Sequence, residues 1–294
     1  MSVAPGELSA RGRAIYGPTP PGQANPCART SPLSEHERRA VVELIAEGRE
    51  GRHSVVIPDE LQTRDWESVS RVALDLDVRL GWDPIGWKIG AASNEIRLSE
   101  GLPGAAPGRI YRSTVFPSGA LLGPELFINY RNVECEFAFR LAEPLPVRSA
   151  AYSEDDVAAA VECLLPTLEI GDTVFDDWYG SSSFFGSCLD NGGGAALVCG
   201  DPVIDWRGLD LPAARIDISL NGQHINSGFG RAAMGHPLTS LTWLVNWLGE
   251  HGLGMAAGEI VSTGTCTGHC FCAPGDTVSV DYGPLGVLTA QFTT

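Results

Sequence analysis

The stretch Val133-Glu-Cys-Glu-Phe-Ala-Phe-Arg-Leu141 decides the fold class. Its apolar side chains recur at every second position, which is the period of a β-strand with one buried face. The same period places Glu134 and Glu136 together on the opposite face. Taken alone, this pair is also typical of the solvated face of an edge strand, so that alternative stays open here.

Helices are predicted on both sides of this strand. Ser34-x-x-Glu37 is a capping box, and it predicts a helix that reaches about Glu50 and ends at Gly51. A second amphipathic helix ends at Gly81, and its apolar face is made of Trp66, Val69, Ala73, Leu76 and Leu80. A third helix is predicted over 153–165, with Ser153 as its cap and Pro166 as its end.

The remaining chain favours short strands and turns. Ile216, Ile218 and Leu220 predict a strand that turns at Asn221-Gly222, and residues 277–292 predict a second hairpin. Residues 237–249 predict an amphipathic helix. Because strands and helices do not alternate regularly, we expect an α+β fold built on a mixed, mostly antiparallel β-roll.

Three regions are expected along the chain. Residues 1–33 predict a proline-rich N-terminal arm, residues 34–84 a helical segment, and residues 85–294 the catalytic β-roll domain.

Composition narrows the class of partner. The 294 residues include 20 basic and 36 acidic ones, for a formal net charge of −16. This balance argues against nucleic acid or an anionic membrane surface as a partner. No apolar stretch approaches the ~20 residues of a transmembrane helix, and the N-terminus lacks an apolar signal core. We therefore expect a cytoplasmic protein, and its acidic, Trp-rich composition with a proline-rich arm favours a homo-oligomer.

A third acid suggests a metal site. Glu169 lies in the apolar segment Pro166-Thr-Leu-Glu-Ile170, where an unpaired carboxylate would be costly to bury. If it converges with Glu134 and Glu136, the three carboxylates repel one another unless a divalent ion neutralises them. Ligation by oxygen alone suggests Mg²⁺ or Mn²⁺ and not zinc.

Lys88 is the single lysine among twenty basic residues, and it lies in Gly86-Trp-Lys-Ile-Gly90. Unlike arginine, a lysine beside an aromatic side chain can have its pKa lowered toward neutrality, which suits proton transfer. The alternative is an ordinary strand lysine in a chain whose codon bias suppresses lysine.

Two glycine-rich loops carry further candidates. Asp190-Asn191 precedes three glycines, so both side chains could face a cavity; no Lys-Ser/Thr follows, as a phosphate loop would require. The second loop contains Thr263, Gly264 and His269. Its Cys266, His269, Cys270 and Cys272 are too close together for a tetrahedral zinc cage, which favours a loop lined by small thiols. His236, before Pro237, is interpreted as structural.

These motifs together resemble a known family. The ordered set is Gly-Trp-Lys-Ile-Gly (86–90), Val-Glu-Cys-Glu-Phe-Ala-Phe (133–139), Pro-Thr-Leu-Glu-Ile (166–170), Asp190-Asn191, Gly-His-Pro-Leu (235–238) with Trp243-Leu244, and residues 257–261 through 274–276. Over about residues 35–292 the chain resembles the fumarylacetoacetate hydrolase superfamily. Within it, the resemblance is to the branch of 2-keto-4-pentenoate hydratases and 4-oxalocrotonate decarboxylases.

The resemblance implies a β-roll of the family's C-terminal type, a bound Mg²⁺ or Mn²⁺, and 2-oxo acid substrates. It makes Glu134, Glu136 and Glu169 the metal ligands and Lys88 an acid/base or substrate-orienting residue. Asp190 becomes a second catalytic residue, and the expected substrate-binding residues are Asn191, Thr263, Gly264 and His269.

The implied activity is that of a lyase working through a metal-chelated enolate, either a hydratase of the 2-hydroxypenta-2,4-dienoate type or a related decarboxylase. The chain departs from typical hydratases in having Pro107-Gly-Arg-Ile110 where they carry Asp-Phe-Gly, and glycines 192–194 where they carry a serine. The Cys266–Cys272 loop departs as well.

Two other functions remain open. The first is a C–C bond hydrolase acting on an acylpyruvate-like diketone. Such hydrolases often use a His-Glu dyad on a mobile segment, whereas residues 93–101 contain Glu95 and Glu100 but no histidine. The second is a non-catalytic small-molecule binder or structural subunit.

Overall fold

The computed structural model describes residues 30–94, 97–98, 102–175 and 188–294. Among the α-helices of these residues are α2 (Glu35–Gly51), α3 (Trp66–Leu80), α5 (Glu154–Ala160) and α7 (Pro237–Glu250). The predicted N-terminal arm lies outside the described residues up to residue 29, as do Glu95 and Glu100.

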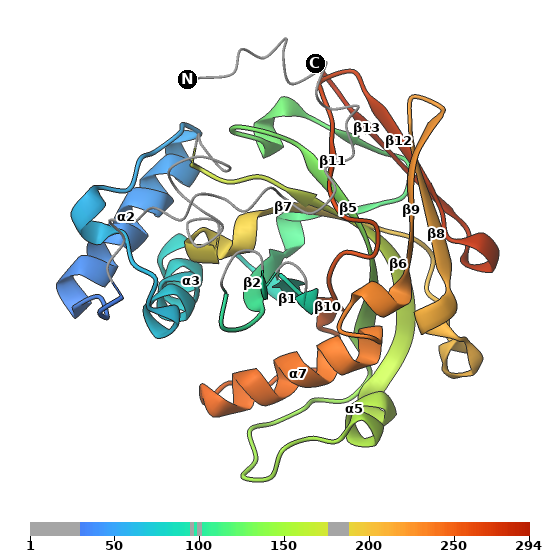
Figure 1. The fold of residues 1–294 in the computed structure, drawn as a ribbon, viewed down its shortest axis with the longest axis horizontal. Helices are drawn as coiled ribbons and strands as arrows, with labels where there is room; N and C mark the ends of the chain where they lie inside the picture. The colour runs from blue at the N-terminus through green and yellow to red at the C-terminus, as the bar shows by residue number, and fades with distance from the viewer. Residues whose placement is uncertain (1–29, 95–96, 99–101, 176–187) are drawn as a thin grey trace.

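The two N-terminal helices form where the sequence predicts them. Ser34 caps α2 in a full capping box with Glu37, and Gly81 ends α3 in the left-handed conformation. The helices lie side by side at one end of the molecule (Figure 1). Their buried faces form one apolar cluster that also includes Ala106, Val174 and Phe175. The helices therefore pack directly on the chain that follows them.

An eight-stranded sheet forms the centre of the fold. Its strand order is β2-β1-β10-β5-β6-β7-β3, with β11 paired to β5. The strands are β1 (Pro84–Gly90), β2 (Ala106–Tyr111), β3 (Val115–Pro117), β5 (Asn132–Leu141), β6 (Val161–Gly171), β7 (Gly194–Cys199), β10 (Ile260–Ser262) and β11 (Cys270–Phe271). Because β5 lies between β10 and β6, the edge-strand alternative for Glu134 and Glu136 is wrong.

A five-stranded sheet packs against the first in the order β4-β13-β12-β8-β9. Both predicted hairpins are present in it. Its strands are β4 (Ala120–Leu122), β8 (Arg215–Leu220), β9 (Gln223–Phe229), β12 (Thr277–Asp281) and β13 (Val287–Phe292). Across both sheets most pairings are antiparallel, and β1–β10, β3–β7 and β4–β13 are parallel. The predicted mixed, mostly antiparallel α+β fold is confirmed.

The predicted helix over 153–165 is wrong in its second half. Ser153 does cap a helix with Asp156, but α5 ends at Ala160 and the chain continues directly as β6. Residues 161–165 are apolar enough to suit either element, and pairing with β5, together with a bridge between Leu164 and Val203, decides for β-structure. Pro166 is tolerated because β7 pairs with β6 only from Thr167 onward, so the missing proline N–H lies where that pairing ends.

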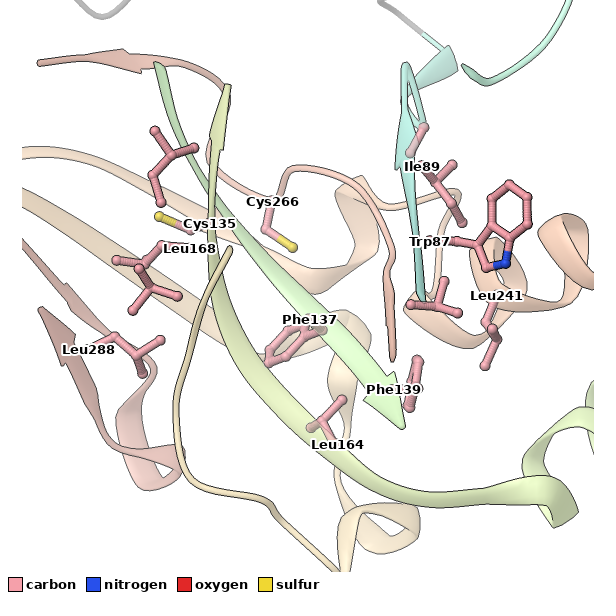
Figure 2. Close-up of a cluster of buried hydrophobic side chains, with 14 of the residues drawn as sticks. Trp87, Ile89, Cys135, Phe137, Phe139, Leu164, Leu168, Leu241, Cys266 and Leu288 are labelled. Atoms are coloured by element: carbon pink, nitrogen blue, oxygen red, sulfur yellow. The ribbon is translucent and has the colours of Figure 1, made fainter. Parts of the chain in front are cut away.

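The main core lies between the two sheets. Figure 2 shows Phe137 and Phe139 of β5 near Leu164 of β6, and Cys135 beside Leu168, with Leu288 of the second sheet on the same side. α7 adds Leu241, which lies near Trp87 of β1. One face of the large sheet is thereby buried in apolar packing, and polar side chains of the other face are left to form a site. In the part of the chain described, no helix is long and apolar enough to span a bilayer.

Candidate active site

Strand register brings the three predicted acids together. Glu134 of β5 lies directly opposite Glu169 of β6, and Glu136 follows two residues along β5, opposite Thr167. Directly opposed residues and residues two apart share a face, so all three carboxylates lie on the side of the sheet away from the main core. The sheet therefore explains how Glu169 converges with two acids that lie 33 and 35 positions before it in the sequence.

Glu136 is the most deeply buried of the three, at 1% exposure. Its Oε2 accepts hydrogen bonds from Ser262 Oγ at 2.6 Å and from the Gly264 backbone N–H at 2.8 Å. Burial, together with repulsion from Glu169 and Glu134, raises the pKa of Glu136 well above its ordinary value. The carboxylate is thus fixed in position by neutral donors, with two other acids close to it.

Glu134 has a different environment. Its Oε1 accepts a hydrogen bond from Asn132 Nδ2 at 2.8 Å and lies 3.0 Å from His269 Nδ1. Burial alone would raise the pKa of Glu134, but His269, Lys88 and Asn132 outweigh it and lower the pKa. His269 and Asn132 also contact each other at 2.7 Å. Two side chains from separate segments therefore hold this carboxylate.

Lys88 projects from β1 into the same site and is 4% exposed. Its Nζ lies 3.0 Å from Glu169 Oε1 and donates a hydrogen bond to the carbonyl of Gly192. Burial by itself lowers the pKa of Lys88, but Glu169 and the other two acids raise it above its ordinary value. The prediction of a lowered lysine pKa is therefore wrong for this arrangement of charges.

Glycines form the walls around Lys88. A Cβ atom on Gly108 would lie 2.8 Å from Lys88 Cε, and one on Gly192 would lie 2.9 Å from both Cε and Nζ. A Cβ atom on Gly194 would lie 3.4 Å from Lys88 Cε. Both departures from typical hydratases thus border the lysine, and we name Gly108, Gly192 and Gly194 the lysine slot.

Asp190 is fully buried and lies outside both of the cavities described below. Its Oδ1 pairs with Arg49 Nε of α2 at 2.6 Å, and its Oδ2 accepts hydrogen bonds from Thr173 Oγ1 and the Val174 N–H. Because both of its carboxylate oxygens are engaged, Asp190 holds the start of the glycine run, residues 192–194, against α2. Its expected catalytic role stays a prediction, and the contacts favour a positioning role.

Three predicted substrate-binding residues also hold the scaffold. The Asn191 amide is hydrogen-bonded to the backbone N–H and carbonyl of Arg109 on β2. Thr263 Oγ1 donates to the Phe137 carbonyl at 2.7 Å, and Gly264 donates to Glu136. Of this group, His269 alone lines a cavity at the carboxylates. Motif matching could not distinguish these roles, because they depend on which way each side chain points.

Sequence reasoning missed Asn132 and Ser262, which hold Glu134 and Glu136. Asn132 is two positions before Glu134, so the same alternation rule placed it on the carboxylate face. Ser262 belongs to β10, whose parallel pairing with β1 puts it opposite Lys88. No local pattern marks Ser262; only the strand order reveals it.

The chemistry of the donors suits a hard divalent cation. The three carboxylates and His269 line a cavity of about 40 Å³. As the side chains stand, no three His, Cys, Asp or Glu residues within the described ranges are gathered closely enough to hold a metal ion. Burial, with repulsion from Glu169 and Glu134, raises the pKa of Glu136, and a divalent cation would offset both effects. Oxygen donors of this kind fit Mg²⁺ or Mn²⁺.

A larger cavity, of about 450 Å³, adjoins the first. Lys88 and Glu169 line both cavities and form their common wall. The larger one is otherwise bounded by the end of α2, β2, the start of β7 and residues around Leu126. The site thus consists of a small, strongly charged cavity and a wider one, with the lysine between them.

Known proteins are similar to this chain in both sequence and fold. The family model described as fumarylacetoacetate (FAA) hydrolase C-terminal matches residues 112–293. The 2-hydroxyhexa-2,4-dienoate hydratase of Comamonas testosteroni is 30% identical over 235 residues, covering 80% of this chain and 88% of that protein. The 4-oxalocrotonate decarboxylase of Pseudomonas putida is 27% identical over 208 residues, covering 71% of this chain and 77% of that protein.

A solved structure agrees in fold. The 4-oxalocrotonate decarboxylase from Pseudomonas putida G7, complexed with magnesium and adipate, superposes with a TM-score of 0.79 at 24% identity, covering 90% of this chain and 99% of that one. The resemblance inferred from the ordered motifs is therefore confirmed. With a family model that matches more than half of its length, this chain belongs to the fumarylacetoacetate hydrolase family.

Proposed function

We propose that this protein is a divalent-metal-dependent lyase acting on a 2-oxo acid or its enol, either as a hydratase of the 2-hydroxypenta-2,4-dienoate type or as a related decarboxylase. The observation that carries the proposal is the convergence of Glu134, Glu136 and Glu169 on one sheet face beside Lys88. The similarity to named hydratases and a decarboxylase supports the same class of reaction.

In this proposal the three glutamates hold Mg²⁺ or Mn²⁺. Such an ion would supply Lewis-acid polarisation of the substrate's keto group. A magnesium complex of one solved relative and a calcium complex of the same enzyme are consistent with a divalent ion in this fold. Asn132 and His269 would orient Glu134, while Ser262 and Gly264 orient Glu136, as supporting contacts do at metal centres.

Lys88 is the proposed proton carrier. Hydration of a 2-hydroxy-2,4-dienoate adds a proton at C5, the hydroxyl group of water at C4 and a proton at C3, while the 2-hydroxyl group loses its proton and becomes the keto oxygen. The net change is the addition of one water, and protons must move along one edge of the substrate. Lys88 is buried and its Nζ lies 3.0 Å from Glu169, so an amine that can give and take a proton stands at the edge of the carboxylate cavity. The Gly192 carbonyl and the lysine slot keep the ammonium in place.

The remaining expectations extend this proposal. We propose a homo-oligomer, with residues 34–84 as a helical addition to a catalytic unit of residues 85–294. We further propose that Asp190 contributes by fixing the glycine run, through its ion pair with Arg49.

Proton NMR of 2-oxopentanoate in D₂O tests the reaction class. With the protein and Mg²⁺, we expect loss of the C3 proton signal, and a chelator should stop it. No exchange at high protein concentration would contradict enolate chemistry, and acylpyruvates would then test the hydrolase alternative. If exchange occurs, two assays separate the activities. Decay of 2-hydroxypenta-2,4-dienoate would indicate a hydratase, and release of CO₂ from an unsaturated 2-oxo diacid would indicate a decarboxylase.

Two variants test the residue roles. Glu134→Gln should abolish metal-dependent turnover with the fold kept, whereas Glu162→Gln, an exposed acid of the same sheet, should not. Full activity in Glu134→Gln would remove the metal assignment. Lys88→Arg keeps the charge but should lose most of the rate, because arginine does not release its proton; an unchanged rate would reduce Lys88 to an ordinary strand lysine.

A further inference from the structure

We propose that the larger cavity takes the tail of the substrate, and that this tail is long, apolar and uncharged. The proposal rests on the proposed function, and it names the substrate class that function leaves open. A five-carbon dienoate would leave this cavity almost empty.

The position of Lys88 connects the two cavities chemically. If the keto acid head lies at the carboxylates, the carbons that gain protons are C3, adjacent to the head, and C5, two carbons further along the chain. Lys88 and Glu169 are the wall shared by the small and the large cavity. A substrate that places C3–C5 beside Lys88 therefore directs everything beyond C5 into the larger cavity.

The volume sets the size of the tail. The larger cavity has about 450 Å³, within the roughly 300–1,000 Å³ typical of small-molecule pockets. At about 30 Å³ per water in the liquid, it has room for a tail of on the order of ten non-hydrogen atoms. A terminal CH₂ group would fill only a small part of that space.

The lining offers apolar and aromatic contacts. Trp82 and Tyr111 meet edge to face with ring centroids 4.9 Å apart, and both line the cavity. Leu126, Ile128 and Leu197 line other parts of it. Such surfaces favour hydrocarbon over hydrated groups.

Three cations of the lining are largely shielded from solvent and already paired within the protein. Arg49 pairs with Asp190 at 2.6 Å, and Arg109 pairs with Asp77 at 3.1 Å while its guanidinium lies 3.5 Å from the Trp87 ring centroid. Lys88 is paired with Glu169. The exposed Arg52 donates to the Pro124 carbonyl. A second carboxylate on the tail would thus have to compete for a buried cation, which favours an uncharged tail.

Calorimetric binding of saturated 2-oxo acids tests the inference independently of turnover. The full chain with Mg²⁺ is titrated with 2-oxopentanoate, 2-oxohexanoate, 2-oxooctanoate and 2-oxodecanoate, and with 2-oxoheptanoate against 2-oxoheptanedioate. We expect the affinity to rise about fourfold per added methylene, and the monoacid to bind more tightly than the diacid of equal length.

A matched pair of variants locates the effect. Leu126→Trp fills part of the cavity and should lower the ratio of ten-carbon to five-carbon affinity at least tenfold. Leu121→Trp is the same change at a residue that is 67% exposed and outside the lining, and it should leave the ratio unchanged. Should Leu126→Trp not fold, the series on the unaltered chain still decides the question.

The outcomes separate this inference from the proposed function. A flat affinity series, or tighter binding of the diacid, overturns the apolar tail even if pentadienoate is turned over. A rising series without turnover of any dienoate supports the tail cavity and contradicts the lyase. Absence of binding by every 2-oxo acid overturns both.

Discussion

Gly192→Ala should impair catalysis far more than it impairs stability. Gly192 has φ 61° and ψ 23°, a left-handed conformation that costs a residue with a Cβ roughly 1–2 kcal/mol. The new Cβ would lie 2.9 Å from Lys88 Cε and Nζ, whereas ordinary contact begins at 3.4 Å. The lysine tip must therefore retreat by about half an ångström and loosen its hydrogen bond to the Gly192 carbonyl.

The chain supplies a closely matched control. Gly81, at the end of α3, has φ 61° and ψ 24°, and a Cβ there meets no atom within 4 Å. Gly81→Ala should lose the same 1–2 kcal/mol of unfolding free energy but keep its turnover. Gly192→Ala should lose about 10- to 100-fold in kcat/KM, because displacing a proton carrier by a fraction of an ångström to an ångström costs that much.

Urea unfolding and the rate of 2-hydroxypenta-2,4-dienoate decay measure the two quantities. Wild-type turnover in Gly192→Ala would refute the reasoning that the lysine slot positions Lys88. Equal losses of turnover in both glycine variants would refute it as well, because backbone strain alone would then explain the effect.

Three further predictions follow from single contacts. Asp190→Asn leaves Arg49 without its counter-charge and should lower the free energy of unfolding in urea by about 3–5 kcal/mol. The control Asp217→Asn breaks the exposed pair with Arg215 and should cost at most about 1 kcal/mol. Equal losses would contradict a structural role for the Asp190–Arg49 pair. His269→Leu should weaken Mg²⁺ binding about 10- to 100-fold in calorimetry, because Glu134 loses a supporting contact. His224→Leu, at an exposed histidine, should leave the affinity for Mg²⁺ unchanged. Unchanged affinity in His269→Leu would exclude this role for His269. His236 Nδ1 caps α7 by accepting a hydrogen bond from the Leu238 N–H. Burial lowers the pKa of His236 below its ordinary value of 6.5. The cap is therefore complete above pH 6.5, and its contribution to stability is lost as the pH falls below that value. Between pH 7.5 and 5.5 the wild type should therefore lose more unfolding free energy than His236→Asn, by up to about 1 kcal/mol, because asparagine keeps a capping side chain without titrating. Parallel pH profiles would contradict the cap.

The sequence predicted the elements whose signals are local. The capping box at Ser34, the alternation through 133–141 and the Asn221-Gly222 turn each depend on neighbouring residues, and each is present as predicted. Alternation also required Glu134 and Glu136 to share a face. Residues 161–165 carry no such signal. Their strand conformation comes from pairing with β5 and from the bridge between Leu164 and Val203, so the helix predicted there was wrong.

Composition and motif order were enough to identify the family, the acids and the unique lysine. What those groups do to one another was decided by tertiary structure, because electrostatic effects depend on distances that sequence does not record. Glu169, opposite Glu134, raises the pKa of Lys88 where an aromatic neighbour suggested lowering. Folding also directs Asp190 toward Arg49, and it places Lys88 between a small charged cavity and a larger one lined in part by apolar and aromatic side chains.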